Sequence, residues 1–214
     1  MKKILCYGDS NTWGFVPGTG ERYPKDVRWP GVVGELLGDE YEIIEDGVNG
    51  RTTSFDQSWG VARNGVKGLD YALMAHYPLD GVVIMLGTND LTIYNAAYAK
   101  KGMSEVLRIV KNANAYFRTE TPVFPNGVKI LLVAPPLLNI ACSRDPSSLY
   151  ANGYEESKKF SAYYHSLSEE YETAFLDAAE YAEASTVDCL HMTEESHIAL
   201  GKAIAEKIKE MFID

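Results

Sequence analysis

Short, mainly apolar segments recur five times along the chain, and glycine, proline or polar residues end each of them. Apolar runs bounded by such turn signals are typical of buried strands. We expect strands at residues 4–7, 41–45, 80–86, 128–134 and 173–177. The third segment is apolar on both faces, which indicates a central strand of a parallel sheet.

Between these segments the apolar residues recur at helical spacing. This spacing predicts helices over residues 29–37, 62–76, 102–118, 153–171 and 193–212, with Thr193 capping the last one. Strands that alternate with crossover helices form a parallel sheet covered on both faces. The predicted fold class is therefore α/β, a doubly wound three-layer α/β/α domain of about five parallel strands that spans residues 1–214.

Polar residues and glycines with possible chemical roles follow four of the five expected strands. Ser10 follows the first, Gly50 the second and Asn89 the third, while Asp188 and His191 come after the fifth. Each of these features alone is more often a turn, a helix cap or a surface pair. In a doubly wound sheet, however, the carboxyl ends of the strands meet at one edge, where ligands bind. The order of these residues therefore predicts a single site at that edge.

These residue types suit nucleophilic catalysis. The hydroxyl of Ser10 needs an adjacent base, and His191 is the best candidate, because histidine is the usual general base in proteins. Asp188 lies three residues before His191, so one turn can bring its carboxylate to the far ring nitrogen. The side-chain amide of Asn89 and the backbone N–H groups of Gly50 and Ser10 can stabilise a developing oxyanion. The pattern predicts acyl transfer through a serine.

Neighbours of these groups are expected to line the substrate pocket. The candidates are Asn11, Trp13, Thr88 and Leu190. Loops 11–28 and 137–152 would supply the apolar entrance, from Trp13, Phe15, Leu137 and Leu138. His197 begins an apolar stripe that continues at Leu200, Ile204 and Ile208, so we expect it to pack in the core rather than to act as the base.

Charge and composition limit the binding partners, the location and the cofactors that we expect. The net charge of −10, without a cluster of lysine or arginine, argues against binding to nucleic acids or anionic membranes. The apolar run after Met1-Lys2-Lys3 is too short for a signal peptide, so we expect a cytoplasmic protein. Three widely spaced cysteines suggest neither disulfides nor a zinc site, and no metal or cofactor is expected.

Three motifs together resemble those of the SGNH, or GDSL, hydrolase family. They are Gly8-Asp9-Ser10, Gly87-Thr88-Asn89-Asp90 and Asp188-Cys189-Leu190-His191. The resemblance implies a flavodoxin-like sheet, Ser10 as nucleophile, Asp188 and His191 as acid and base, and Asn89 as an oxyanion donor. Gly50 is the favoured glycine of the oxyanion hole, and Gly47 is the alternative.

Residues 8–14, 26–29, 50–53 and 85–90 are more specifically similar to the bacterial arylesterase and acyltransferase (perhydrolase-like) branch of that family. This similarity implies hydrolysis of small acyl esters, such as acetyl esters of aryl alcohols or sugars, with acyl transfer to alcohols or peroxide in some members. It also implies a homo-oligomer. Aromatic residues in the expected loops suit an interface, namely Trp13, Phe15, Tyr23, Trp29, Trp59 and Tyr150.

Other functions remain open at this stage. A thioesterase or a lysophospholipase would use the same three catalytic residues. A flavodoxin-like module that only binds a small ligand is a non-enzymatic alternative, although it would not need a complete set of catalytic groups. The α/β-hydrolase fold is disfavoured, because its serine lies in a G-x-S-x-G motif far from the start of the chain.

Overall fold

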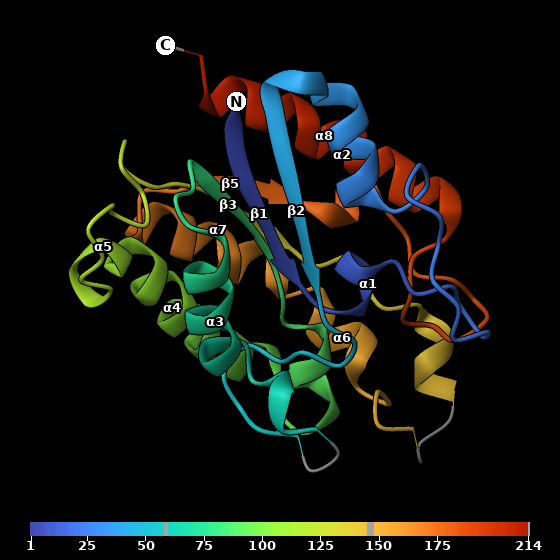
Figure 1. Cartoon of the computed structure of the whole chain (residues 1–214). Coiled ribbons are helices and arrows are strands. Elements are labelled where there is room, and N and C mark those ends of the chain that lie inside the picture. The colour runs from blue at the N-terminus through green and yellow to red at the C-terminus, as the bar shows by residue number, and fades with distance from the viewer. Residues whose placement is uncertain (58–59, 145–147, 214) are drawn as a thin grey trace.

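The computed structural model describes residues 1–57, 60–144 and 148–213. Those residues form one parallel sheet of five strands in the order β2-β1-β3-β4-β5 (Figure 1). The strands are β1 (Lys2–Gly8), β2 (Tyr41–Gly47), β3 (Gly81–Met85), β4 (Lys129–Ala134) and β5 (Ala174–Asp177). This arrangement confirms the predicted doubly wound α/β class.

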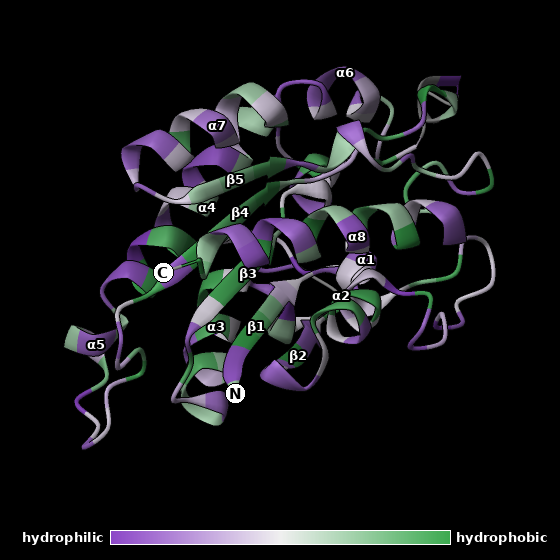
Figure 2. Cartoon of the chain, turned by 90° about the horizontal axis from the view of Figure 1, so that it is seen from above, coloured by the Kyte–Doolittle hydropathy of each residue, from purple (hydrophilic) through white to green (hydrophobic). Residues whose placement is uncertain are grey.

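Helices cover both faces of the sheet, as Figures 1 and 2 show. The longer helices are α2 (Trp29–Leu37), α3 (Gly65–His76), α4 (Ala96–Lys111), α7 (Phe160–Glu170) and α8 (Glu194–Met211). Short ones are α1 (Ser10–Trp13), α5 (Ala113–Tyr116) and α6 (Gly153–Ser157). Single 3-10 turns span Gly38–Glu40, Val61–Arg63, Thr88–Thr92, Ile140–Arg144 and Ala178–Glu180.

Side chains along β1 point alternately to the two faces of the sheet, and the core has one half on each face. Ile4 and Cys6 pack with the apolar faces of α2 and α8, whereas Leu5 and Tyr7 pack with those of α3, α4 and α7. Successive side chains of a strand point to opposite faces, so one strand contributes to both halves. Burial on both faces explains why β3 is apolar throughout.

Helix ends differ from the predicted ones where side chains interrupt the backbone pattern. The helix predicted over residues 102–118 begins instead at Ala96, where the Asn95 side chain accepts the N–H of Tyr98, and it ends at Lys111. The Asn112 side chain then donates to the carbonyl of Arg108 at 2.8 Å, and α5 follows. The helix predicted over residues 153–171 is divided into α6 and α7 by residues 158–159. Thr193 caps α8 as predicted, accepting the N–H of Ser196.

Strand register brings the loops of the site together. Gly8 pairs with Gly47 of β2 and with Met85 of β3, so these three strands end at the same level. The segments that follow them therefore emerge side by side at the carboxyl edge of the sheet. Within the described parts of the chain, no helix is long and apolar enough to span a membrane.

Candidate active site

Ser10 begins the four-residue helix α1, which lies directly on the ends of β1 and β2. The Asp9 carboxylate caps this helix by accepting the N–H of Asn11 at 2.9 Å. The approach is close enough to require two glycines. A Cβ on Gly8 would lie 2.0 Å from Thr12 Oγ1, and one on Gly47 would lie 2.2 Å from Trp13 N. Glycine at both positions lets α1 hold Ser10 at the sheet edge.

The segment after β5 folds into a tight turn around Asp188. Its Oδ1 accepts the backbone N–H groups of Leu190 and His191 at 3.1 and 3.0 Å. Cys189, inside the turn, has a left-handed φ of 64°. The Asp188 carboxylate thereby fixes the backbone that carries His191, three residues further on.

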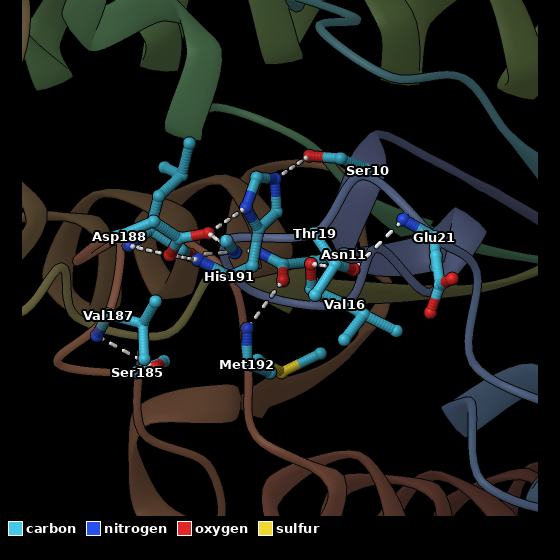
Figure 3. A network of polar contacts seen from close by, with 12 residues as sticks. Ser10, Asn11, Val16, Thr19, Glu21, Ser185, Val187, Asp188, His191 and Met192 are labelled. Carbon is cyan, nitrogen blue, oxygen red and sulfur yellow. Dashed lines mark hydrogen bonds and ion pairs between the residues drawn. The ribbon is translucent and has the colours of Figure 1, made fainter.

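Three side chains from the two ends of the chain form a continuous hydrogen-bonded row (Figure 3). Ser10 Oγ lies 2.9 Å from His191 Nε2, and His191 Nδ1 lies 2.8 Å from Asp188 Oδ2. Ser10 and His191 are buried, with 5% and 8% of their surfaces exposed. Burial alone would raise the pKa of Asp188, but hydrogen bonds from the His191 side chain and from the two backbone N–H groups lower it to about 2. The carboxylate therefore stays charged beside the imidazole.

Asn11 joins α1 to the turn that holds the histidine. Its Nδ2 donates to the carbonyl of Leu190 at 3.3 Å, and its Oδ1 accepts the N–H of Met192 at 3.0 Å. Both polar ends of this buried side chain are thus used by the protein itself. Asn11 and Leu190, predicted as pocket residues, lie beside the row and tie its two halves together.

Asn89 lies in the 3-10 turn Thr88–Thr92, directly after β3. Its Nδ2 faces the carbonyl of Arg51 at 3.1 Å and Asp9 Oδ2 at 3.3 Å, and its Oδ1 accepts the hydroxyl of Tyr150 at 3.3 Å. Three separate segments therefore orient this amide. Thr88, also predicted in the pocket, is buried, and its hydroxyl has no hydrogen-bond partner among the described residues.

Arg51, the residue after Gly50, holds the Gly50 loop in place. Gly50 has a φ of 78°, the left-handed conformation that glycine adopts readily. The Arg51 guanidinium donates to the carbonyl of Gly8 at 2.9 Å and pairs with Asp46 at 2.7 Å. It also lies 3.9 Å from the centre of the Tyr7 ring. These contacts hold the loop against the ends of β1 and β2.

Two further carboxyl groups lie behind Asn89, and sequence reasoning assigned neither a role. Burial raises the pKa of Asp9 to about 6 and that of Asp90 to about 7. Asp90 Oδ2 accepts the N–H of Thr53 at 2.9 Å, and its Oδ1 lies 2.5 Å from Thr53 Oγ1. The pair Asp90–Thr53 connects the segment after β3 with the segment after β2.

Trp13 and Phe15 lie next to the row on the chain that leaves α1. The two rings are 6.2 Å apart, and Phe15 stacks on the His191 ring at 4.1 Å. Both are half-buried, in agreement with an entrance position. Leu138 was expected there too, but this was wrong, because its side chain is buried in the core with only 2% exposed.

His197 is fully buried on α8, which confirms the packing role expected for it. Its Nδ1 accepts the backbone N–H of Trp29 at 3.4 Å. Burial lowers the pKa of His197 to about 3, so the ring is neutral near pH 7. Among the described residues, no group of three or more His, Cys, Asp or Glu side chains is arranged to hold a metal ion.

A parallel sheet that brings a serine, a histidine and an asparagine together at its carboxyl edge suits an acylhydrolase. A model of the GDSL-like lipase/acylhydrolase family matches residues 6–198, and the chain belongs to that family. It is a carboxylic ester hydrolase.

Solved structures agree with this assignment. A carbohydrate acetylesterase from Sinorhizobium meliloti is 36% identical, with a TM-score of 0.90 over 99% of this chain and 100% of that chain. The native aryl esterase of M. smegmatis is 33% identical, with a TM-score of 0.90 over 99% and 100%. No curated protein matches the chain. The branch indicated by the sequence motifs is thus supported by the similarity of whole folds.

Proposed function

We propose that the chain hydrolyses small acyl esters, such as acetyl esters of aryl alcohols or sugars, through an acyl-enzyme on Ser10. The observation that carries this proposal is the row Ser10–His191–Asp188, with contacts of 2.9 and 2.8 Å. The names of the similar aryl esterase and carbohydrate acetylesterase favour the same substrates.

The reaction follows from the atoms in the row. Ser10 Oγ bonds to the carbonyl carbon while its proton passes to His191 Nε2. Breakage of the ester C–O bond then releases the alcohol, whose oxygen takes that proton. In the second half, water attacks the Ser10 ester and gives a proton to His191, which returns it to Ser10 Oγ as the carboxylic acid leaves. Asp188 keeps its negative charge throughout and stabilises the imidazolium.

The proposed oxyanion hole consists of the Asn89 amide and the backbone N–H groups of Gly50 and Ser10. Two acceptors already face Asn89 Nδ2, and the longer contact, 3.3 Å to Asp9, is the one that a developing oxyanion would displace. Gly50 is favoured over Gly47 because Gly47 has another reason to be glycine, namely its contact with the backbone of Trp13.

Acyl transfer to a small alcohol or to peroxide belongs to the same proposal, because the Ser10 ester accepts any nucleophile that His191 can deprotonate. The half-buried rings of Trp13 and Phe15 beside His191 support an apolar entrance that reduces the advantage of water. Incubation of an activated acetyl ester with dilute benzyl alcohol should yield benzyl acetate in excess of the alcohol's mole fraction. Transfer at or below that fraction would leave a plain hydrolase.

The decisive test of the nucleophile is Ser10→Ala. This variant should fold and lose hydrolysis of an activated acetyl ester, and a serine-directed phosphonate should label Ser10 in the parent protein only. A panel of aryl esters of graded acyl length, a thioester and a lysophospholipid then defines the substrate. Preference for the thioester or the lysophospholipid would replace the small-ester assignment, whereas full activity of Ser10→Ala would end the nucleophile assignment.

We also propose that the protein forms a homo-oligomer, with an interface that differs in part from the residues expected from the sequence. Trp29 is fully buried in the core, so its place in an interface was wrong, and Trp59 lies outside the described residues. An exposed aromatic cluster supports the proposal instead, since Tyr94 stacks on Tyr98 at 4.0 Å and Phe55 lies 4.9 Å from Tyr94. Light scattering at micromolar concentration should find a species larger than 23.7 kDa. A monomer alone would refute the proposal.

A further inference from the structure

The loop of residues 14–23 touches both members of the Asp188–His191 pair. The Phe15 ring stacks on the imidazole of His191 with centroids 4.1 Å apart and planes inclined by 23°. Three residues further along the loop, the Gly18 N–H donates to Asp188 Oδ2 at 3.3 Å. One loop thus meets the flat face of the His191 ring and the Asp188 oxygen that binds its Nδ1. Figure 3 shows the Asp188–His191 pair itself.

This loop is fixed independently of the pair. The Phe15 N–H donates to the carbonyl of Ser10 at 3.0 Å, and the Tyr23 N–H donates to the carbonyl of Gly14 at 2.7 Å, which closes the base of the loop on α1. The Arg22 guanidinium donates to the Trp13 carbonyl at 2.7 Å and pairs with Glu45 of β2 at 3.1 Å. Because the loop is anchored elsewhere, its contacts can restrict the movement of the Asp188 and His191 side chains; a loose loop would move with them.

We infer that the 14–23 loop positions the base of the reaction: Phe15 fixes the plane of the His191 ring, and Gly18 fixes the Asp188 oxygen that faces Nδ1. This inference rests on the proposed role of His191. Two hydrogen bonds along an edge leave an imidazole free to tilt about that edge, and a ring stacked on its face removes this freedom. The negative face of a phenyl ring also attracts the imidazolium that forms in the transition state, so the contact strengthens during the reaction. Phe15 and Gly18 are positioning residues, because they act through His191 and Asp188.

Phe15→Leu keeps an apolar side chain and removes the planar ring. We expect kcat for an activated acetyl ester to fall roughly 2- to 12-fold, the range that an aromatic contact supports, with KM nearly unchanged. The rate at which a small phosphonate labels Ser10 should fall by the same factor, since labelling needs the base but not the alcohol site. Phe15→Trp should recover most of both rates, because it restores a ring. Thermal unfolding of each variant checks that the fold is intact.

Gly18 offers a test with a matched control in the same loop. Gly18 has a φ of 75°, and a Cβ there would lie 2.7 Å from Val187 Cγ1, next to Asp188. Gly20 has a similar φ of 80°, and a Cβ there would meet nothing within 4 Å. Gly18→Ala should therefore lower kcat, while Gly20→Ala, with the same backbone strain, should not. Adding Val187→Ala to Gly18→Ala removes the clash and should restore much of the lost kcat.

Other outcomes would overturn the inference. If Phe15→Leu keeps the parent kcat and labelling rate, the loop only covers the pair. If it raises KM alone, Phe15 is a wall of the substrate pocket. Equal losses in Gly18→Ala and Gly20→Ala would point to general strain of the loop. His191→Ala is measured in parallel: an active His191→Ala protein would refute the proposed function itself, a result separate from every outcome for Phe15 and Gly18.

Discussion

The carboxyl groups at the carboxyl edge of the sheet form two sets, and the pKa values of the two sets differ for physical reasons. Asp188, with 24% of its side chain exposed, accepts backbone N–H groups from Leu190 and His191, and its other oxygen faces the imidazole. Its pKa is about 2. Asp9 and Asp90 are almost completely buried, and their pKa values rise to about 6 and about 7.

The balance between desolvation and hydrogen-bond donors sets the pKa of each carboxyl group. Hydrogen bonds to Asp188 outweigh its desolvation, so a full negative charge faces His191, the residue proposed to gain a proton during the reaction. For Asp90, desolvation outweighs the two contacts with Thr53, and the charge of nearby Asp9 raises the pKa further. The first region supports the charge of the proposed base, His191, and the second region connects the loops that follow β1, β2 and β3.

Asp188→Asn removes the negative charge of the first region, and we expect it to lower kcat more than any other variant discussed below. Because two backbone N–H groups hold the oxygen at the Oδ1 position, the amide nitrogen would take the place of Oδ2 and donate to Nδ1. His191 would then carry its proton on Nε2 and lack the negative charge that stabilises the imidazolium, so kcat for an activated acetyl ester should fall by about 10⁴. Steady-state kinetics at pH 7.5–8 measure the loss, with Asp90→Asn as a control that should stay within about tenfold of the parent. Similar losses in the two variants would contradict the division into two regions.

Asn89→Ala tests the proposed oxyanion donor at the border of the second region. Removal of one such donor commonly costs about 10²–10³ in kcat, and KM should change little because the oxyanion exists only in the transition state. Kinetics with the same acetyl ester provide the comparison. A normal kcat with a raised KM would make Asn89 a residue that binds the ground-state substrate.

The five strands, and the order of Ser10, Asn89, Asp188 and His191, could be predicted because they depend on local patterns and on one topological rule. Parallel strands separated by helices must end at the same edge, so residues 181 positions apart in sequence meet as Ser10 and His191 do. The helix predicted over residues 102–118 was wrong at its ends, because apolar spacing does not register side-chain caps: the Asn95 side chain caps the start of α4, and Asn112 follows its last residue.

Contacts between loops could not be predicted. Asn89 meets Asp9 across 80 residues, and Thr53 meets Asp90 across 37, through segments that carry no periodic pattern. The stacking of Phe15 on His191 depends on how the loop after α1 turns back. Sequence motifs marked where the chemistry lies, while the residues that hold it in place required the three-dimensional arrangement.

In the second region, Asp90→Asn should change how the stability of the protein depends on pH. A carboxyl with a raised pKa stabilises the fold fully below its unfolded pKa near 4, and that contribution is lost as the pH rises through about 7. An amide imitates the neutral carboxyl, donating to Thr53 Oγ1 and accepting the Thr53 N–H. The free energy of unfolding of the variant, relative to that of the parent, should therefore rise between pH 4 and pH 7. Urea unfolding across this range measures it, and a constant difference would mean that Asp90 is ionised throughout.

The two buried histidines, His191 and His197, differ in the same way as the carboxyl groups. The prediction for His197 carries the smallest expected effect. His191 has a carboxylate partner, whereas His197 is buried without one, and its pKa is about 3. A depressed histidine pKa stabilises the fold above the unfolded value near 6.5, and this contribution is lost as the pH falls below it. At pH 5 the loss amounts to about 2 kcal/mol, because the unfolded imidazole is then largely protonated and the folded one is not. His197→Asn keeps an acceptor for the N–H of Trp29 and has no proton to gain, so its stability should fall less than that of the parent between pH 7 and pH 5. Urea unfolding at the two pH values tests this, and equal losses would show that His197 takes up a proton in the folded protein.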